Sequence, residues 1–276
     1  MIDSSKSGIV VGASSDIGLA LVNNFYSKKY NLVGTYRTKT DKHAALQKYC
    51  KHLSKCDLLD SASIDSFSDE IMELKFKWNF LIIAAGTLQP IGKFEECDFN
   101  EWMDGLQVNL QSQIQIIHSL LPLRSRDDPL FPIVVLFAGG GTNSAPRNFS
   151  SYTLSKIALI KAVELLDNEM SDVRFAIIGP GWVKTKIHEE TIQAAQAAGS
   201  AFTETKERFL KNNFISMNNV VDCFNWALDT PKDVIGGRNI SVSHDKWGEE
   251  DMAEALRNNI DMYKLRRSGN AWSSSS

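Results

Sequence analysis

The sequence lacks the features of exported, membrane-spanning and strongly charged proteins. Its 276 residues include four cysteines, whose spacing matches neither a metal site nor a redox pair. The longest apolar stretches, such as 80–85, are too short to span a bilayer, and residues 1–7 contain no apolar signal core. The net charge of −3 gives no reason to expect nucleic acid or an acidic membrane as a partner. We therefore expect a cytoplasmic protein that binds no metal, no nucleic acid and no membrane.

What the sequence does contain is an alternation of apolar strand-like runs and helical segments. The predicted strands are 8–11, 31–37, 53–57, 79–85, 132–137, 173–178 and 236–242. The predicted helices are 19–26, 41–51, 61–75, 99–121, 150–170 and 218–228. Such alternation is typical of a parallel sheet with helices on both faces and right-handed crossovers. We therefore predict an α/β fold, a Rossmann-type doubly wound parallel sheet in a three-layer α/β/α single domain.

The first strand opens directly into a glycine-containing turn and then a helix. Glycines allow a pyrophosphate to approach the backbone closely, and free N–H groups at a helix N-terminus favour its charge. The three-glycine fingerprint is incomplete, because Asp16 stands where a middle glycine might be, so a plain strand-to-helix turn remains an alternative. The candidate cofactor-binding residues of this turn are Gly12, Ser14, Ser15, Asp16, Ile17 and Gly18.

The end of the second strand carries Tyr36 and Arg37. Dinucleotide folds often place an acid here to bind the adenosine ribose hydroxyls. The absence of that acid removes a repulsion, and an arginine suits a 2′-phosphate. We therefore expect NADP(H) to be preferred over NAD(H), although Arg37 alone could equally be a solvated surface charge.

Tyr152 and Lys156 are four positions apart near the start of a predicted helix, so their side chains share one face. An ammonium beside a phenol favours the phenolate and is expected to lower the pKa of the tyrosine. Such a tyrosine can exchange a proton with a carbonyl or an alcohol oxygen, although an ordinary surface pair has the same spacing. Asn109 lies in the middle of another predicted helix, where asparagine indicates either a local kink or a polar task.

Two segments stand apart from the strand and helix alternation. Residues 183–216 are polar and amphipathic, and we expect them to form a helical lid over the substrate rather than a second domain. Their low apolar density leads us to expect a segment that is mobile without ligand. The core domain is expected to end near residue 243, followed by a C-terminal extension, 244–276, that fades from helix into a polar tail.

Taken together, these pieces resemble the short-chain dehydrogenase/reductase family in its compact single-domain form, over roughly residues 8–243. The resemblance rests on the order and spacing of modest signals along one chain. The matching positions are Gly12, Gly18, Asp57, Ala85, Gly86, Asn109, Tyr152, Lys156, Pro180, Gly181 and Thr185.

The resemblance implies a role for each matching residue. Tyr152 would be the general acid/base, Lys156 would bind the nicotinamide ribose and lower the tyrosine pKa, and Asn109 would anchor a water in a proton relay. The other residues implied at the cofactor are Asp57 and Leu58 near the adenine, Ala85 and Gly86 after the fourth strand, and Pro180, Gly181, Val183 and Thr185 around the nicotinamide.

The resemblance also implies a homodimer or homotetramer built on the helices 99–121 and 150–170. Leu159, Val163 and Leu166 support this expectation, because the second helix carries more apolar residues than one core face needs.

One departure from the family concerns the substrate oxygen. The family usually has a serine at the end of the fifth strand, where this sequence has Gly139 beside Ala138. Loss of one such donor can reduce the rate by about 10²–10³. Thr142, Ser144 or a backbone N–H of the glycine loop could replace it, and we favour Thr142 because it directly follows a pliant triglycine.

These observations favour an NADP(H)-dependent oxidoreductase that acts on a small-molecule carbonyl or alcohol. The missing serine keeps a second class open, a cofactor-binding sensor or partner protein with little or no chemistry. Sugar-nucleotide modification is a further alternative, because it uses the same tyrosine and lysine, but the short C-terminal region argues against it.

Overall fold

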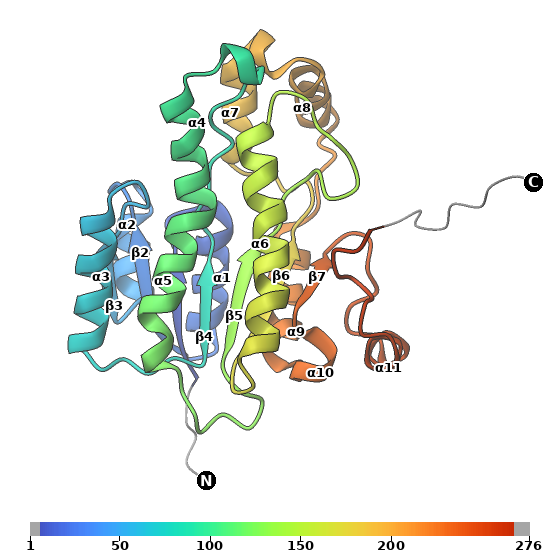
Figure 1. Cartoon of the computed structure of the whole chain (residues 1–276). Helices are drawn as coiled ribbons and strands as arrows, with labels where there is room; N and C mark the ends of the chain where they lie inside the picture. Colours follow the sequence, from blue (N-terminus) through green and yellow to red (C-terminus); the bar gives the residue numbers. More distant parts are fainter. Residues whose placement is uncertain (1–5, 268–276) are drawn as a thin grey trace, which may run out of the picture.

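A computed structural model describes residues 6–267 and contains one seven-stranded sheet in which every pairing is parallel (Figure 1). The strand order is β3-β2-β1-β4-β5-β6-β7. The strands are β1 (Ser7–Val11), β2 (Asn31–Tyr36), β3 (His52–Lys55), β4 (Phe80–Ile83), β5 (Ile133–Phe137), β6 (Arg174–Gly179) and β7 (Arg238–Ser241). The predicted doubly wound α/β fold is confirmed.

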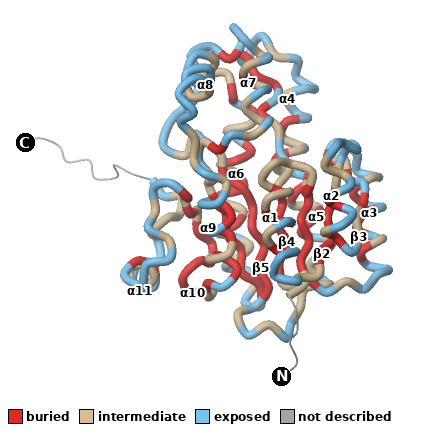
Figure 2. The backbone as a smooth tube through the Cα atoms, turned by 180° about the vertical axis from the view of Figure 1, so that it is seen from behind, coloured by how far each residue is buried: buried red, intermediate tan, exposed pale blue. Residues whose placement is uncertain are grey.

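Helices cover both faces of the sheet, and the strands between them form the buried interior (Figure 2). The central strands β4 and β5 read FLII and IVVLF and are buried throughout, as expected for strands covered on both sides. One face packs against α1 (Asp16–Ser27), α2 (His43–Tyr49), α9 (Met217–Asp229), α10 (Lys232–Ile235) and α11 (Glu250–Asn258). The other packs against α3 (Ser61–Glu73), α5 (Ser112–Leu120) and α6 (Ser150–Glu169).

The expected single helix over 99–121 is in fact two helices joined by a π-helical segment. α4 (Phe99–Leu106) ends at the π segment Gln107–Gln111, and α5 follows directly. Asn109 lies within this segment and is fully buried. The helix is therefore irregular at this asparagine, and π segments are frequent at functional sites.

The expected lid, residues 183–216, forms α7 (Ile187–Ala194), a short 3₁₀ turn and α8 (Ser200–Lys211) beyond one end of the sheet (Figure 1). A small apolar cluster joins these helices to the body of the protein. Its buried members are Leu88, Ile91, Phe149 and Ala198. The lid is therefore docked in this structure by more apolar contact than its sequence suggested.

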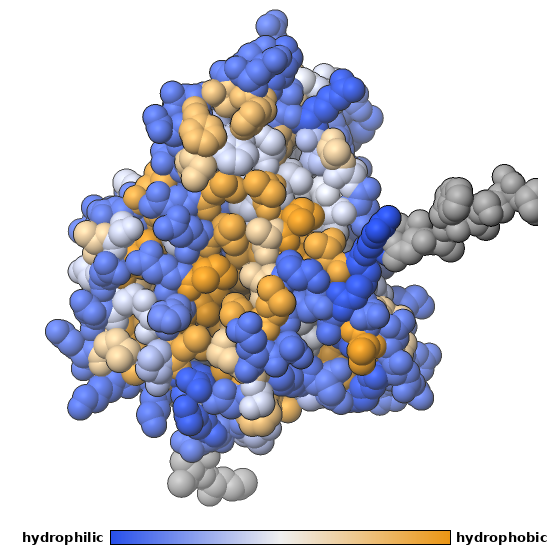
Figure 3. Space-filling view, viewed as in Figure 1, coloured by the Kyte–Doolittle hydropathy of each residue, from blue (hydrophilic) through white to orange (hydrophobic). Residues whose placement is uncertain are grey.

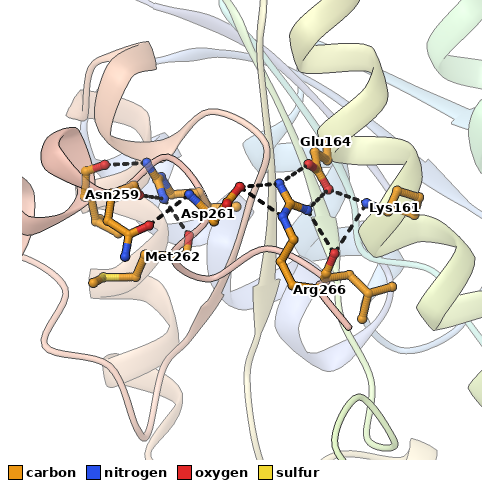
Figure 4. Close-up of polar contacts among 9 residues, drawn as sticks. Lys161, Glu164, Asn259, Asp261, Met262 and Arg266 are labelled. Atoms are coloured by element: carbon orange, nitrogen blue, oxygen red, sulfur yellow. Dashed lines mark hydrogen bonds and ion pairs between the residues drawn. The ribbon is translucent and has the colours of Figure 1, made fainter. Parts of the chain in front are cut away.

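The C-terminal extension does not fade out within the described residues. It forms α11 and then runs beside β7, where the Asn239 N–H donates to the carbonyl of Tyr263 at 2.8 Å. Arg266 bonds both Glu164 of α6 and Asp261 at 2.7 Å, as Figure 4 shows. The hydrogen bonds that Glu164 accepts from Arg266 and Lys161 lower its pKa to about 2. The expected polar tail at 273–276 lies outside the described residues.

None of the helices between residues 6 and 267 is long and apolar enough to cross a bilayer.

Candidate active site

A single large cleft of about 1550 Å³ lies at the carboxyl ends of the strands. It extends from the turn after β1 to the loop after β6, beneath α7 and α8. The strand order reverses between β1 and β4, and ligands of open α/β sheets bind in the crevice at such a point. The cleft exceeds the size typical of pockets for one drug-sized molecule.

The turn after β1 forms one wall of the cleft. Gly12 has φ +76°, and a Cβ added there would lie 2.8 Å from the backbone nitrogen of Ala85, so only glycine fits. The Gly12 N–H donates to Oγ1 of Thr35 at 2.9 Å. Ser15 caps α1 by accepting a bond from the N–H of Gly18 at 3.0 Å.

Gly18 does not itself line the cleft, and its expected place at the pyrophosphate stays a prediction. A Cβ at Gly18 would lie 2.2 Å from the carbonyl oxygen of Gly12, so the glycine allows α1 to pack closely on the turn. The cleft residues of this turn are Gly12, Ser14, Ser15, Asp16 and Ile17.

Asp16, in the position of a middle glycine, organises the basic end of the cleft. Its carboxylate bonds Nζ of Lys42 at 2.6 Å and the N–H of Lys186 at 2.7 Å. Although burial opposes ionisation, these two contacts lower the pKa of Asp16 below its usual value. Lys42 also donates to the carbonyl of Ser14. Lys42 could not be predicted from the sequence, because no motif marks it and only the fold brings it to the turn.

The two residues at the end of β2 behave differently. Arg37 is exposed and lines the cleft, whereas Tyr36 does not line it. The ring of Tyr36 instead meets the ring of His43 edge-on, with centroids 4.7 Å apart. The expected contact of Tyr36 with the cofactor stays a prediction. Asp57 and Leu58, expected at the adenine, both line the cleft.

At the other end of the cleft, Tyr152 and Lys156 project from one face of α6. The Lys156 Nζ lies 5.8 Å from the centroid of the Tyr152 ring. Burial, with a smaller contribution from the charge of Glu190, raises the pKa of Tyr152 to about 12. Burial lowers the pKa of Lys156 to about 8. The tyrosine pKa is therefore raised and not lowered as expected, because burial disfavours the charged phenolate.

Asn109 fixes the loop that follows β4. Its Oδ1 accepts from the N–H of Thr87 at 3.0 Å, and its Nδ2 donates to the carbonyl of Thr87 at 2.8 Å. Both ends of the amide thus bind one residue of the protein. Ala85 and Gly86, immediately before Thr87, line the cleft as expected.

Glu190 of α7 reaches the same loop from the lid. Its Oε2 accepts from the N–H of Leu88 at 2.7 Å and from Oγ1 of Thr87 at 2.9 Å. Burial raises the pKa of Glu190, and these hydrogen bonds offset only part of that effect. Neither Thr87 nor Glu190 could be predicted from the sequence, because they are about a hundred residues apart and neither belongs to a motif.

The phenol of Tyr152 occupies the space beside Gly139 into which the side chain of the family serine would project. A Cβ at Gly139 would lie 2.5 Å from the phenol oxygen of Tyr152. A Cβ at Gly140, by contrast, would have no atom within 4 Å. Thr142 and Ser144, the expected replacements, both line the cleft.

The loop after β6 closes this end of the cleft. Gly181 has φ +71°, and its carbonyl accepts from the N–H of Val183 at 3.1 Å. Pro180, Gly181, Val183 and Thr185 all line the cleft, as the resemblance implied.

Comparison with known proteins agrees with this geometry. Residues 6–196 match the family model described as short chain dehydrogenase. An uncharacterised oxidoreductase of Schizosaccharomyces pombe is 27% identical over 179 residues, which cover 64% of this chain and 70% of the relative. An NADPH-dependent 3-dehydrocapnine reductase of Ornithobacterium rhinotracheale is 24% identical over 205 residues, 71% of each chain.

A solved structure has the same fold. The short-chain dehydrogenase/reductase YIR035C of Saccharomyces cerevisiae superposes with a TM-score of 0.76 at 20% identity, covering 91% of this chain and 99% of its own. Because the family model matches well over half of the sequence, and the fold agrees, this chain belongs to the short-chain dehydrogenase family of oxidoreductases.

Proposed function

We propose that the protein reduces the carbonyl group of a small molecule with NADPH. The observation that carries this proposal is the placement of Tyr152 and Lys156 at the far end of the cleft that begins at the glycine turn. A screen of ketones and aldehydes that follows NADPH absorbance tests it. Turnover of at least one carbonyl, absent in Tyr152→Phe, is the expected result.

The cleft residues fit a nicotinamide dinucleotide. Gly12 permits close backbone approach, and Arg37 and Lys42 offer positive charge at the same end. When bound, the nicotinamide supplies the hydride that adds to the carbonyl carbon. The residues that would hold the cofactor are Gly12, Ser14, Ser15, Asp16, Ile17, Arg37, Lys42, Asp57, Leu58, Ala85, Gly86, Lys156, Pro180, Gly181, Val183 and Thr185.

The protonation state of Tyr152 favours reduction over oxidation. A phenol whose pKa is raised to about 12 keeps its proton at neutral pH and is a poor base. It can donate that proton to the carbonyl oxygen as the C=O double bond breaks. Lys156 then stabilises the negative charge left on the phenol. Asn109 acts as a positioning residue, because it fixes Thr87 beside the reacting groups.

The preference for NADPH over NADH rests on Arg37 and Lys42. Guanidinium and ammonium groups suit a 2′-phosphate. Arg37→Asp should reverse the preference in fluorescence titrations with the two reduced cofactors. Lys39→Asp is the matched control, because Lys39 is exposed and does not line the cleft. Tighter binding of NADH by the unaltered protein would contradict this part of the proposal.

The hydrogen bond to the substrate oxygen is assigned to Thr142, besides Tyr152 itself. Thr142→Ala should reduce kcat by at least about tenfold, or ~1.4 kcal/mol. Ser144→Ala, which alters a second hydroxyl on the same loop, should have a smaller effect. Equal rates for Thr142→Ala and the unaltered protein would assign this role to the backbone or to Tyr152 alone.

The crowding at Gly139 favours a second candidate, a cofactor-binding sensor. The phenol of Tyr152 lies where a family serine would project, so the usual pair of donors is absent. Tight NADPH binding without turnover across the carbonyl panel would favour this candidate.

We also propose a homo-oligomer and a cytoplasmic location. Leu159 and Val163 are buried in the core, so they are not surplus apolar residues as expected from the sequence. An apolar surface nevertheless lies over α5 and α6 (Figure 3), and Leu154 and Leu165 of α6 are half-exposed. Light scattering should detect a dimer or tetramer at micromolar concentration. The four free cysteines are consistent with a reducing compartment, which cell fractionation can test.

A further inference from the structure

We propose that Glu190 determines substrate specificity, selecting carbonyl compounds that carry a positively charged amine and disfavouring those that carry a carboxylate. This inference rests on the proposed carbonyl reduction and names the substrate class for the same site.

The first observation is the fixed position of the carboxylate. Glu190 is held by Thr87 and Leu88, and Thr87 is in turn held by Asn109 of the buried π segment. The side chain therefore cannot swing freely with its helix. Its charge also acts on the phenol of Tyr152, and both residues line the same cleft.

The second observation is that the carboxylate forms no direct ion pair, although the charge of Arg37 acts on it from beyond ion-pair distance. The donors to the carboxylate are the hydroxyl of Thr87 and the N–H groups of Leu88 and Gln89, which are all neutral. No lysine or arginine within residues 6–267 forms an ion pair with Glu190. A partly buried carboxylate without a directly bonded cation is costly, and such costs are typical of functional sites.

The third observation is the sign of the other charges at this end. Helices α4, α7 and α8 contribute Glu101, Asp104, Glu190 and Glu204 to the cleft wall, whereas its cations, Arg37, Lys42, Lys156, Lys186 and Lys264, come from other segments. Glu204 is already paired with Arg208 at 3.0 Å. Burial lowers the pKa of His188, which stacks on Trp182, so this imidazole stays neutral at neutral pH.

These charges predict an order of preference among cationic, neutral and anionic carbonyl substrates. A cation near the carbonyl gains attraction from Glu190 in a cleft where water screens it little, whereas an anion is repelled. The acids Glu101 and Asp104 lie exposed on α4 and add a weaker field of the same sign. Neutral carbonyl compounds should therefore fall between the two.

The test uses three acetophenones of similar shape, with para-aminomethyl, para-ethyl and para-carboxylate groups. In the unaltered protein with NADPH, kcat/KM should fall in that order. Glu190→Gln keeps an acceptor for Thr87 and Leu88 but removes the charge. It should reduce the ratio of kcat/KM between the amine and the carboxylate by at least about tenfold, which is ~1.4 kcal/mol, mainly through KM.

Glu189→Gln is the matched control, because it makes the same change one residue away on α7. Glu189 is exposed and lines a separate groove on the outer side of α7 and α8. This variant should keep the unaltered order and ratio. If Glu190→Gln and Glu189→Gln shift the ratio equally, or neither shifts it, the specificity role is wrong while carbonyl reduction stands. If none of the three ketones turns over although NADPH binds, the proposed reduction fails and the inference fails with it.

Discussion

The two ends of the cleft are built in different ways. At the glycine turn, the wall is backbone, and the charged side chains are the exposed Arg37 and the ion-paired Lys42 and Asp16. At the far end, the wall is made of side chains held in place by burial, namely Tyr152 and Lys156. The charged groups at the glycine turn are therefore exposed or ion-paired. At the reacting end, burial shifts the pKa values of Tyr152 and Lys156 in the directions that favour their neutral forms.

This difference shows where substitutions should act. A binding end made of backbone fails when a side chain intrudes on the turn. A reacting end made of buried ionisable groups loses activity when one group is removed. While these groups are present, their burial lowers the stability of the fold. Substitutions at the two ends should therefore separate cofactor affinity from turnover.

The largest effect is expected for Tyr152→Phe. It removes the proton donor without changing the glycine turn, so kcat should fall by about 10³ while the Kd for NADPH changes by less than about twofold. Stopped-flow turnover and fluorescence titration measure the two quantities. A parallel loss of NADPH affinity would show that the two ends are not separable.

The next effect concerns the other end. Gly18→Val places a branched side chain within 2.2 Å of the Gly12 carbonyl, so the turn must open. NADPH affinity should fall by about a hundredfold, or ~2.7 kcal/mol. Asn23→Val adds the same side chain to an exposed position of α1 and should leave affinity unchanged. Unaltered affinity in a folded Gly18→Val variant would show that the turn tolerates the side chain.

A smaller effect should come from restoring the family serine. Gly139→Ser forces its Cβ against the phenol of Tyr152, so kcat should fall by about tenfold rather than rise. Gly140→Ser, where a Cβ meets nothing within 4 Å, is the control. A faster Gly139→Ser enzyme would mean that the phenol can move aside and that the serine is simply missing.

The smallest effect is on stability and depends on pH. The pKa of Lys156 is about 8 in the fold and near its ordinary value of 10.5 when unfolded. Between these two pH values the unfolded chain binds one more proton than the folded chain, so stability rises with pH. Below about pH 8 Lys156 is charged in both states, and the folded state carries the full cost of burying that charge. Lys156→Met should therefore stabilise the fold by roughly 1–3 kcal/mol at neutral pH and by less near pH 10. Urea unfolding at the two pH values measures this, and a destabilised variant at neutral pH would contradict it.

Several features followed directly from local sequence. Buried parallel strands such as β4 and β5 are continuous apolar runs, and such runs are visible without a structure. The spacing of Tyr152 and Lys156 placed both on one helix face, because the period of a helix is short and regular. Asn109 indicated an irregularity in its helix, because asparagine is a poor helix former, and a π-helical segment lies there.

The features of this protein divide into those that depend on neighbours along the chain and those that depend on contacts between distant segments. The sequence by itself determined the doubly wound sheet, the glycine turn and the order of the cleft-lining segments, because each depends on neighbours along the chain. Only the tertiary structure decided which way Tyr36 turns, why position 139 must be glycine, and that Lys42 and Glu190 enter the cleft. It also decided the pKa values of Tyr152 and Lys156, because desolvation depends on everything packed around a group and not on the one residue four positions away.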